Sequence, residues 1–183
     1  MFDACVLYPA PLRDFLMQLS LTDLFRAKWT TEIHDEWITN LLANRPDLTR
    51  AQLDRTRDLM NQNVRDCLVA DYSHLQAAIE LPDPDDRHVV AAAIKCHADA
   101  IVTFNLRDFP ESVTSSYGIE VIHPDDFINA QFGLSSSLVC GAAKKHRARL
   151  KSPPKSVEQY LMALESQGLP QTASALKYFA DLL

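Results

Sequence analysis

The sequence predicts an α/β protein in which a parallel sheet is covered by helices on both faces. Three short apolar segments, at residues 2–8, 100–104 and 119–122, have the composition of buried strands. Helical patterns separate these segments, and almost no hairpin signal lies between them. Parallel strands that alternate with helices are buried on both faces, so their sequences are continuously apolar. Because three strands make a small sheet, we expect one or two further strands that the pattern does not reveal.

Prolines and capping residues mark the elements of the first half. Pro9 ends the first strand, and Pro11 suits the first turn of a helix. Thr30 or Thr31 and then Thr49 are candidate N-caps, and Pro46 closes the helix between them. In chain order, the expected helices of this half run from residue 11 to about 27, from 31 to 44, from 50 to about 67, and from 72 to 81.

The second half begins with an acidic turn, Pro82-Asp83-Pro84-Asp85-Asp86, which leads into a helix at 87–97. The run Ala91-Ala92-Ala93 lets this helix pack closely on a sheet. Strands at 100–104 and 119–122 follow, and Pro124 starts a short helix that ends near Gly133. The serines at 135–137 mark a boundary, beyond which helices are expected at about 138–150, 156–167 and 170–182. We therefore expect one domain at 1–132 and a helical extension at 135–183.

Composition limits the class of protein. The chain of 183 residues is long enough for one buried core, and 47% hydrophobic with 23% charged residues is ordinary for a globular protein. The longest apolar run, at 89–94, is far shorter than the roughly 20 residues of a membrane helix. The four scattered cysteines include no C-x-x-C pair, which indicates free thiols in a reducing compartment. No secretory signal opens the sequence. We expect a cytoplasmic protein.

Charge is distributed unevenly. The net charge of −6 argues against a protein that coats nucleic acid by bulk electrostatics. Between Phe127 and Val157, however, there is no acidic residue. The basic residues of this stretch either form a solvated helix face or bind RNA phosphates. The basic residues in question are Lys144, Lys145, Arg147, Arg149, Lys151 and Lys155.

Carboxylates are the candidate chemical groups. Asp3 lies in an apolar segment where aspartate is unusual, and Glu36 lies within the second helix. The acidic turn at 83–86 opens a helix, and Asp108 follows the second strand. Ligands of parallel sheets bind beyond the carboxyl ends of the strands, where such carboxylates would repel one another without a divalent cation. Alternatively, aspartates such as Asp83 and Asp85 serve as helix N-caps.

Four segments of the sequence, in this order, resemble PIN domains, in particular the branch related to VapC-type toxins of toxin–antitoxin pairs. The resemblance covers about residues 1–132. The segments are Phe2-Asp3-Ala4-Cys5-Val6-Leu7-Tyr8, Glu36-Trp37, Asp83-Pro84-Asp85-Asp86-Arg87-His88-Val89-Val90-Ala91-Ala92-Ala93 and Val102-Thr103-Phe104-Asn105-Leu106-Arg107-Asp108-Phe109-Pro110.

The resemblance implies a flavodoxin-like, three-layer α/β/α sandwich and Mg²⁺- or Mn²⁺-dependent cleavage of RNA, such as tRNA or mRNA. Asp3, Glu36 and Asp86 match the carboxylates that hold the metal and orient the attacking water. The family also implies a cognate antitoxin protein as partner, and a homodimer.

The sequence departs from the family pattern in two places. Many PIN domains have Thr-x-Asp after the second strand, where this chain has Thr103-Phe104-Asn105. Either Asn105 coordinates through its amide oxygen, or Asp108 supplies the fourth carboxylate; Thr103 either binds a carboxylate or phosphate or only packs in the strand. The second departure is that Asp3 stands two residues from the first residue, so either the true start lies earlier or the first strand is short.

Two other classes of function compete with the nuclease. A phosphatase with an aspartate nucleophile normally has a second aspartate two residues later, where this chain has Cys5, so we discount it. The serious alternative is a catalytically impaired PIN-like module that binds RNA or a partner protein without cleavage, which Asn105 would explain. Convergence of Asp3, Glu36 and Asp86 within metal-bridging distance would favour the nuclease.

Overall fold

A computed structural model describes residues 1–183, which divide into two compact units. The first unit consists of Met1–Tyr8 and Ala27–His123, and the second of Pro9–Arg26 and Pro124–Leu183. No helix is long and apolar enough to span a membrane. The expected division at 132–135 follows the order of the sequence, whereas the second unit also includes residues 9–26. That one functional domain ends at residue 132 and a second begins at residue 135 stays a prediction.

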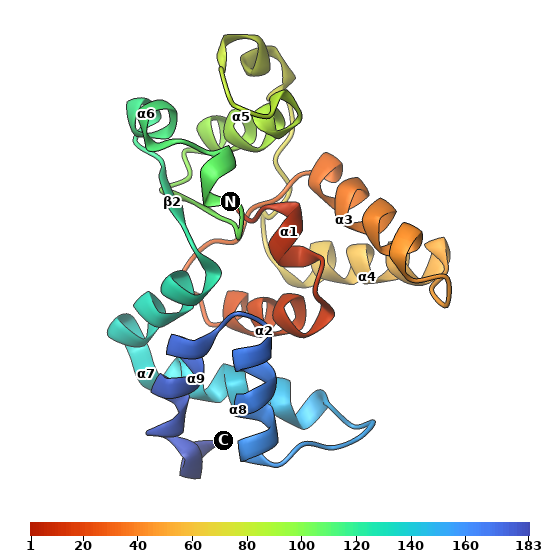
Figure 1. Cartoon of the computed structure of the whole chain (residues 1–183), viewed down its shortest axis with the longest axis vertical. Coiled ribbons are helices and arrows are strands. Elements are labelled where there is room, and N and C mark those ends of the chain that lie inside the picture. Colours follow the sequence, from red (N-terminus) through yellow and green to blue (C-terminus); the bar gives the residue numbers. More distant parts are fainter. The chain divides into compact units, whose positions relative to one another are not determined.

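The first unit is a small parallel sheet with helices around it (Figure 1). Its strands are β1 (Ala100–Val102) and β2 (Glu120–Ile122), which pair in parallel. Its α-helices are α1 (Ala4–Leu7), α3 (Thr31–Asn44), α4 (Arg50–Asn63), α5 (Arg87–Lys95) and α6 (Glu111–Thr114). Its 3₁₀ turns are η1 (Ser73–Ala78), η2 (Pro84–Asp86), η3 (Leu106–Asp108) and η4 (Ser115–Tyr117).

Single bridges extend this sheet, which explains why further strands were not visible in the pattern. Asp3 N donates to Val102 O at 3.1 Å, and Phe2 forms a parallel bridge with Val102. On its other side Phe2 N donates to Lys28 O at 2.9 Å, and Trp29 bridges Leu68, again in parallel. Five chain segments are therefore hydrogen-bonded side by side. Their order is the segment at Leu68, the segment at Trp29, the segment at Phe2, β1 and β2. The expectation of one or two hidden strand segments is confirmed at the level of these bridges.

The predicted strand at 2–8 is wrong beyond Phe2. The chain leaves the sheet at Asp3, whose carboxylate accepts a hydrogen bond from Ala4 N at 2.6 Å and caps α1. Aspartate is among the best N-cap residues, so it starts a helix here although the following residues are apolar. Val6 and Leu7 are fully buried in the helix, and their burial gave the segment the composition of a strand.

The predicted helices from Thr31 to Lys95 lie close to where their capping residues placed them. Thr30 caps α3, and Thr49 forms a capping box with Gln52 at the start of α4. Three of these predictions were wrong, two in where the helix ends and one in the type of helix. The helix α4 ends at Asn63, the segment 72–81 contains only the 3₁₀ turn η1, and α5 ends at Lys95, after which His97 has a positive φ of 51°.

The second unit is entirely helical. Its elements are α2 (Ala10–Ser20), α7 (Pro124–Arg149), α8 (Val157–Ser166), α9 (Pro170–Lys177) and the 3₁₀ turn η5 (Ala180–Leu182). The helix α2 is shorter than the predicted 11–27. The span α7 has a kink at Ser135, whose φ of −162° and ψ of 96° are not helical, so the predicted break near 133–137 is confirmed.

Buried polar contacts hold these helices together. The Asp125 carboxylate of α7 accepts hydrogen bonds at 2.8 Å from the backbone N–H groups of Gln171 and Thr172, and so caps α9. His146 stacks on Phe15 of α2 and lies 3.0 Å from the hydroxyl of Tyr160 in α8. These contacts explain why residues 9–26 group with the C-terminal helices.

Candidate functional site

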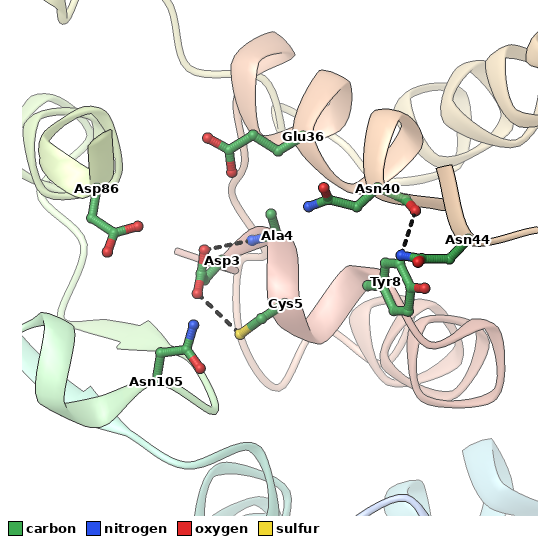
Figure 2. Close-up of a pocket in the computed structure, with 9 residues that line it drawn as sticks. All are labelled: Asp3, Ala4, Cys5, Tyr8, Glu36, Asn40, Asn44, Asp86 and Asn105. Atoms are coloured by element: carbon green, nitrogen blue, oxygen red, sulfur yellow. Dashed lines mark hydrogen bonds between the residues drawn. The ribbon is translucent and has the colours of Figure 1, made fainter. Parts of the chain in front are cut away.

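A cavity of about 400 Å³ lies in the first unit, within the size range of small-ligand sites. Figure 2 shows its lining residues, which come from the start and end of α1, one face of α3, the end of η2 and the residue before η3. They are Asp3, Ala4, Cys5, Tyr8, Glu36, Asn40, Asn44, Asp86 and Asn105. Four of the predicted site residues, namely Asp3, Glu36, Asp86 and Asn105, therefore line one cavity.

Asp3 is buried, with 4% of its surface exposed, and its carboxylate is held by three donors. Oδ1 accepts from Ala4 N at 2.6 Å, and Oδ2 accepts from Thr103 Oγ1 at 2.7 Å and from Cys5 Sγ at 3.0 Å. A buried carboxylate is tolerated only when hydrogen bonds replace its lost hydration. The position of Asp3 at the junction of sheet and helix is therefore fixed by its neighbours.

Thr103 connects this carboxylate to the other side of the cavity. Besides donating to Asp3, its hydroxyl oxygen accepts from Asn105 N at 2.9 Å. The strand β1 ends at Val102, so Thr103 and Asn105 lie just beyond its carboxyl end, where ligands of parallel sheets bind. Of the two interpretations of Thr103, contact with a carboxylate is the one present in the structure.

Cys5 belongs to the same network but was not predicted as a site residue. Its Sγ lies 3.2 Å from Thr103 Oγ1 and accepts from Phe104 N at 3.2 Å. Burial, followed by the charge of Asp3 and the hydrogen bond to it, raises the pKa of the thiol to about 12. Cys5 therefore stays protonated at neutral pH and acts as a hydrogen-bond donor to Asp3.

Asp86 ends η2 and precedes α5, as the acidic turn predicted. Burial, followed by the nearby charges of Asp3, Asp108, Asp83 and Glu36, raises the pKa of its carboxyl to about 7. Such a pKa means that the surroundings of Asp86 disfavour another negative charge. A cation at this place would relieve that repulsion.

Glu36 projects from α3 and makes a close contact with His88. The distance between Glu36 Oε1 and His88 Nε2 is 2.6 Å, and His88 Nδ1 lies 3.7 Å from Glu32 Oε2. Burial, at 2% exposure, lowers the pKa of His88, but Glu36, Glu32 and Asp3 outweigh this effect and leave the pKa raised. His88 therefore fixes Glu36.

The donor set fits a hard divalent cation. Three carboxylates and one amide oxygen line the cavity, and oxygen donors of this kind are the ligands of Mg²⁺ and Mn²⁺. No three His, Cys, Asp or Glu side chains stand close enough to share one ion as they are oriented. In the structure Glu36 contacts His88, and Asp3 is hydrogen-bonded to Thr103.

Between the two candidates for a fourth ligand, the cavity contains Asn105 and not Asp108. The charge of Asp108 contributes to the raised pKa of Asp86.

The predicted RNA-binding residues Lys144, Lys145, Arg147 and Arg149 lie in α7 of the second unit. Lys144, Lys145 and Arg149 are exposed. Arg147 donates from Nη1 to Lys155 O at 2.8 Å and from Nη2 to Leu183 O at 3.0 Å. Its guanidinium therefore ties the end of α7 to the residues that follow, while a role of the four residues in RNA binding stays a prediction.

Asp3 follows a segment of a parallel sheet and lines one cavity with Glu36 and Asp86, and comparisons with known proteins give the class of this protein. The family model described as PIN domain matches residues 1–107, more than half of the chain. The chain belongs to the PIN-domain family. A second family model, the VapC50 C-terminal domain, matches residues 124–177.

A curated relative is similar over part of the chain. It is the Mycobacterium tuberculosis protein named "Putative ribonuclease VapC50", which is 37% identical over 93 residues, or 49% of this chain. The chain spans about half (52%) of the length of this relative. No solved structure matches.

Proposed function

We propose that this protein is a metal-dependent endoribonuclease that hydrolyses RNA phosphodiester bonds at the cavity of Asp3, Glu36 and Asp86. The observation that carries the proposal is the convergence of these three carboxylates on one cavity with Asn105. The raised pKa of Asp86, caused by burial and by the surrounding acids, supports a cation as the missing countercharge. The name of the VapC50 relative and the PIN family support the class of reaction.

Asp3, Glu36, Asp86 and the amide oxygen of Asn105 would hold Mg²⁺ or Mn²⁺. When bound, such an ion lowers the pKa of a coordinated water and offsets the charge that develops on the phosphate. Asp3 is kept in one orientation by Ala4, Cys5 and Thr103, and Glu36 is kept in place by His88. The protein residues thus supply a preorganised acidic surface on which a phosphate can bind only with a cation.

The family also supports a biological setting. We propose that the chain is the toxin of a toxin–antitoxin pair, bound and inhibited by a cognate antitoxin protein, that it acts on tRNA or mRNA in the cytoplasm, and that it forms a homodimer. The two-stranded sheet and its parallel bridges support the three-layer α/β/α sandwich of PIN domains. The four free cysteines support a reducing compartment.

The test is cleavage of tRNA and of a single-stranded RNA by the purified protein in Mg²⁺, Mn²⁺ or EDTA. Asp3→Asn and Asp86→Asn are expected to abolish cleavage, whereas the matched control Asp85→Asn is expected to retain it. Asp85 is exposed, adjacent in sequence to Asp86, and absent from the cavity. Cleavage that persists in EDTA, or that survives in both site variants, would refute the proposal.

One observation favours a second candidate, an inactive PIN-like module that binds RNA or a partner without cleavage. Asn105 stands in the cavity where many family members have a carboxylate, so the site has one negative charge fewer. This candidate predicts RNA binding with no cleavage in any metal. An Asn105→Asp variant that gains activity while the wild type has none would favour it.

A further inference from the structure

The cavity has two chemically different ends (Figure 2). Asp86 and Asn105 lie at one end, with Asp3 and Glu36 next to them. We call Asp3, Glu36 and Asp86 the acidic end. The other end, which we call the neutral end, is lined by Tyr8, Asn40 and Asn44. No charged side chain lines the neutral end, so the metal chemistry proposed above does not use it.

The helix α3 contributes residues to both ends of the cavity. Glu36, Asn40 and Asn44 are each four residues apart, so they lie on one face of the helix. At 1.5 Å per residue, this row extends for about 12 Å along the helix axis. The row begins with a carboxylate and continues with two amides, which places neutral hydrogen-bonding groups directly beside the acidic end.

The amides have hydrogen-bonding capacity that the protein does not use. Asn40 makes no side-chain hydrogen bond within the protein, so its amide oxygen and both N–H donors are available. Asn44 Nδ2 donates to the backbone carbonyl of Asn40 at 2.9 Å, which orients the Asn44 amide and leaves its oxygen as an acceptor. Both residues are exposed to solvent, while Tyr8 is half-buried.

We propose that the neutral end binds one unpaired nucleobase of the RNA, next to the phosphodiester at the acidic end. Proteins that read single-stranded RNA hydrogen-bond the exposed edges of bases and stack aromatic rings on their faces. Asn40 and Asn44 provide the donors and acceptors for an edge, and the ring of Tyr8 provides an apolar surface. An uncharged pair of amides suits a base better than a phosphate, which would call for a cation. This inference rests on the proposed function and adds a base preference beside the cleaved bond.

The experiment uses the full chain and a short single-stranded RNA with one cleavage site, in which each base flanking the cut is varied in turn. Binding is measured by fluorescence anisotropy in Ca²⁺, and cleavage is measured in Mn²⁺ as separate kcat and KM values. The variants are Asn40→Leu and Asn44→Leu, which retain size but lose the amide. Thr39→Ala, an exposed neighbour on α3 outside the cavity, is the matched control, and a thermal melt verifies folding.

The wild type is expected to prefer one base at one flanking position. Each leucine variant is expected to weaken binding and raise KM about tenfold for the preferred RNA and much less for the others, with little change in kcat. The control should match the wild type. Equal binding of all RNAs by the wild type, or an unchanged base preference in both leucine variants, would overturn the inference.

The outcomes distinguish failure of the base-site proposal from failure of the proposed nuclease function. A base preference in binding that depends on Asn40 and Asn44, together with no cleavage in any metal, would support the base site and refute only the nuclease function. If the leucine variants cleave RNA with the base preference of the wild type, the nuclease function is supported and only the base site is overturned. No binding and no cleavage of any RNA would overturn both.

Discussion

Thr103 Oγ1 donates a 2.7 Å hydrogen bond to Asp3 Oδ2, joining residues that are 100 positions apart in the sequence. The bond lies at the carboxyl end of β1, and both residues are buried. Because the same hydroxyl oxygen accepts from Asn105 N, the loop after β1 is held against the carboxylate that caps α1. This relationship is the structural basis of the acidic end of the cavity.

Thr103→Val is therefore expected to lower the free energy of unfolding by about 2 kcal/mol, since it deprives a buried carboxylate of a donor and Asn105 N of its acceptor. Thr103→Ser retains the hydroxyl and is expected to lose much less. Urea denaturation of both variants measures the difference. Equal losses in valine and serine variants would show that the methyl group, and not the hydrogen bond, stabilises this position.

Asp86→Asn is expected to stabilise the metal-free protein while it weakens metal binding. The variant removes a partly buried charge from the neighbourhood of Asp3, Asp108, Asp83 and Glu36, which is worth on the order of 1 kcal/mol at a site that is partly exposed. Thermal melts in EDTA and in Mn²⁺ measure both effects. In EDTA the melting temperature of the variant should be higher than that of the wild type. Addition of Mn²⁺ should raise the melting temperature of the variant less than it raises that of the wild type. A lower melting temperature in EDTA would contradict this electrostatic interpretation.

Asn105→Asp should tighten Mn²⁺ binding, because it adds a carboxylate to the cavity. An increase of about tenfold corresponds to about 1.4 kcal/mol. Asp108→Asn is the matched comparison, since Asp108 does not line the cavity, and it should change the affinity much less. Calorimetric titration of the metal-free proteins measures the affinities. A larger effect of the Asp108 variant would make Asp108 the fourth ligand.

The second unit should contribute a pH dependence of stability through His146. Burial, with a smaller effect of Arg149, lowers the pKa of this imidazole from 6.5 to about 4. Between these values the unfolded chain binds a proton at His146 and the folded chain does not, so the free energy of unfolding falls as the pH drops from about 6.5 to about 4. The slope from this group is at most about 1.4 kcal/mol per pH unit. In His146→Gln this part of the slope should disappear; an unchanged slope would assign it to other groups.

The order of motifs was enough to predict which carboxylates line one cavity. Asp3, Glu36 and Asp86 each stand at a position that local signals define: a strand end, a capped helix and a proline-rich turn. The parallel sheet places Asp3 and Asn105 beyond the ends of neighbouring strand segments, whereas Glu36 and Asp86 reach the cavity from α3 and η2.

Features that depend on distant packing could not be predicted in this way. The segment 4–7 is as apolar as a strand, and only the cap at Asp3 turns it into a helix. Residues 9–26 form a unit with residues 124–183 because α2 contacts α7, which no local pattern of α2 reveals. Asn40 and Asn44 carry no motif, although their spacing from Glu36 on a predicted helix was a usable signal.

The position of a bound Mn²⁺ ion, located by its anomalous scattering in a crystal of the wild-type protein, tests the proposed metal site most directly. The proposal predicts one ion in the cavity, coordinated by carboxylate oxygens of Asp3, Glu36 and Asp86, with the Asn105 amide oxygen beside it. A crystal grown in saturating Mn²⁺ with no ion in this cavity, or with its ion bound elsewhere, would contradict the assignment of these residues as the metal site.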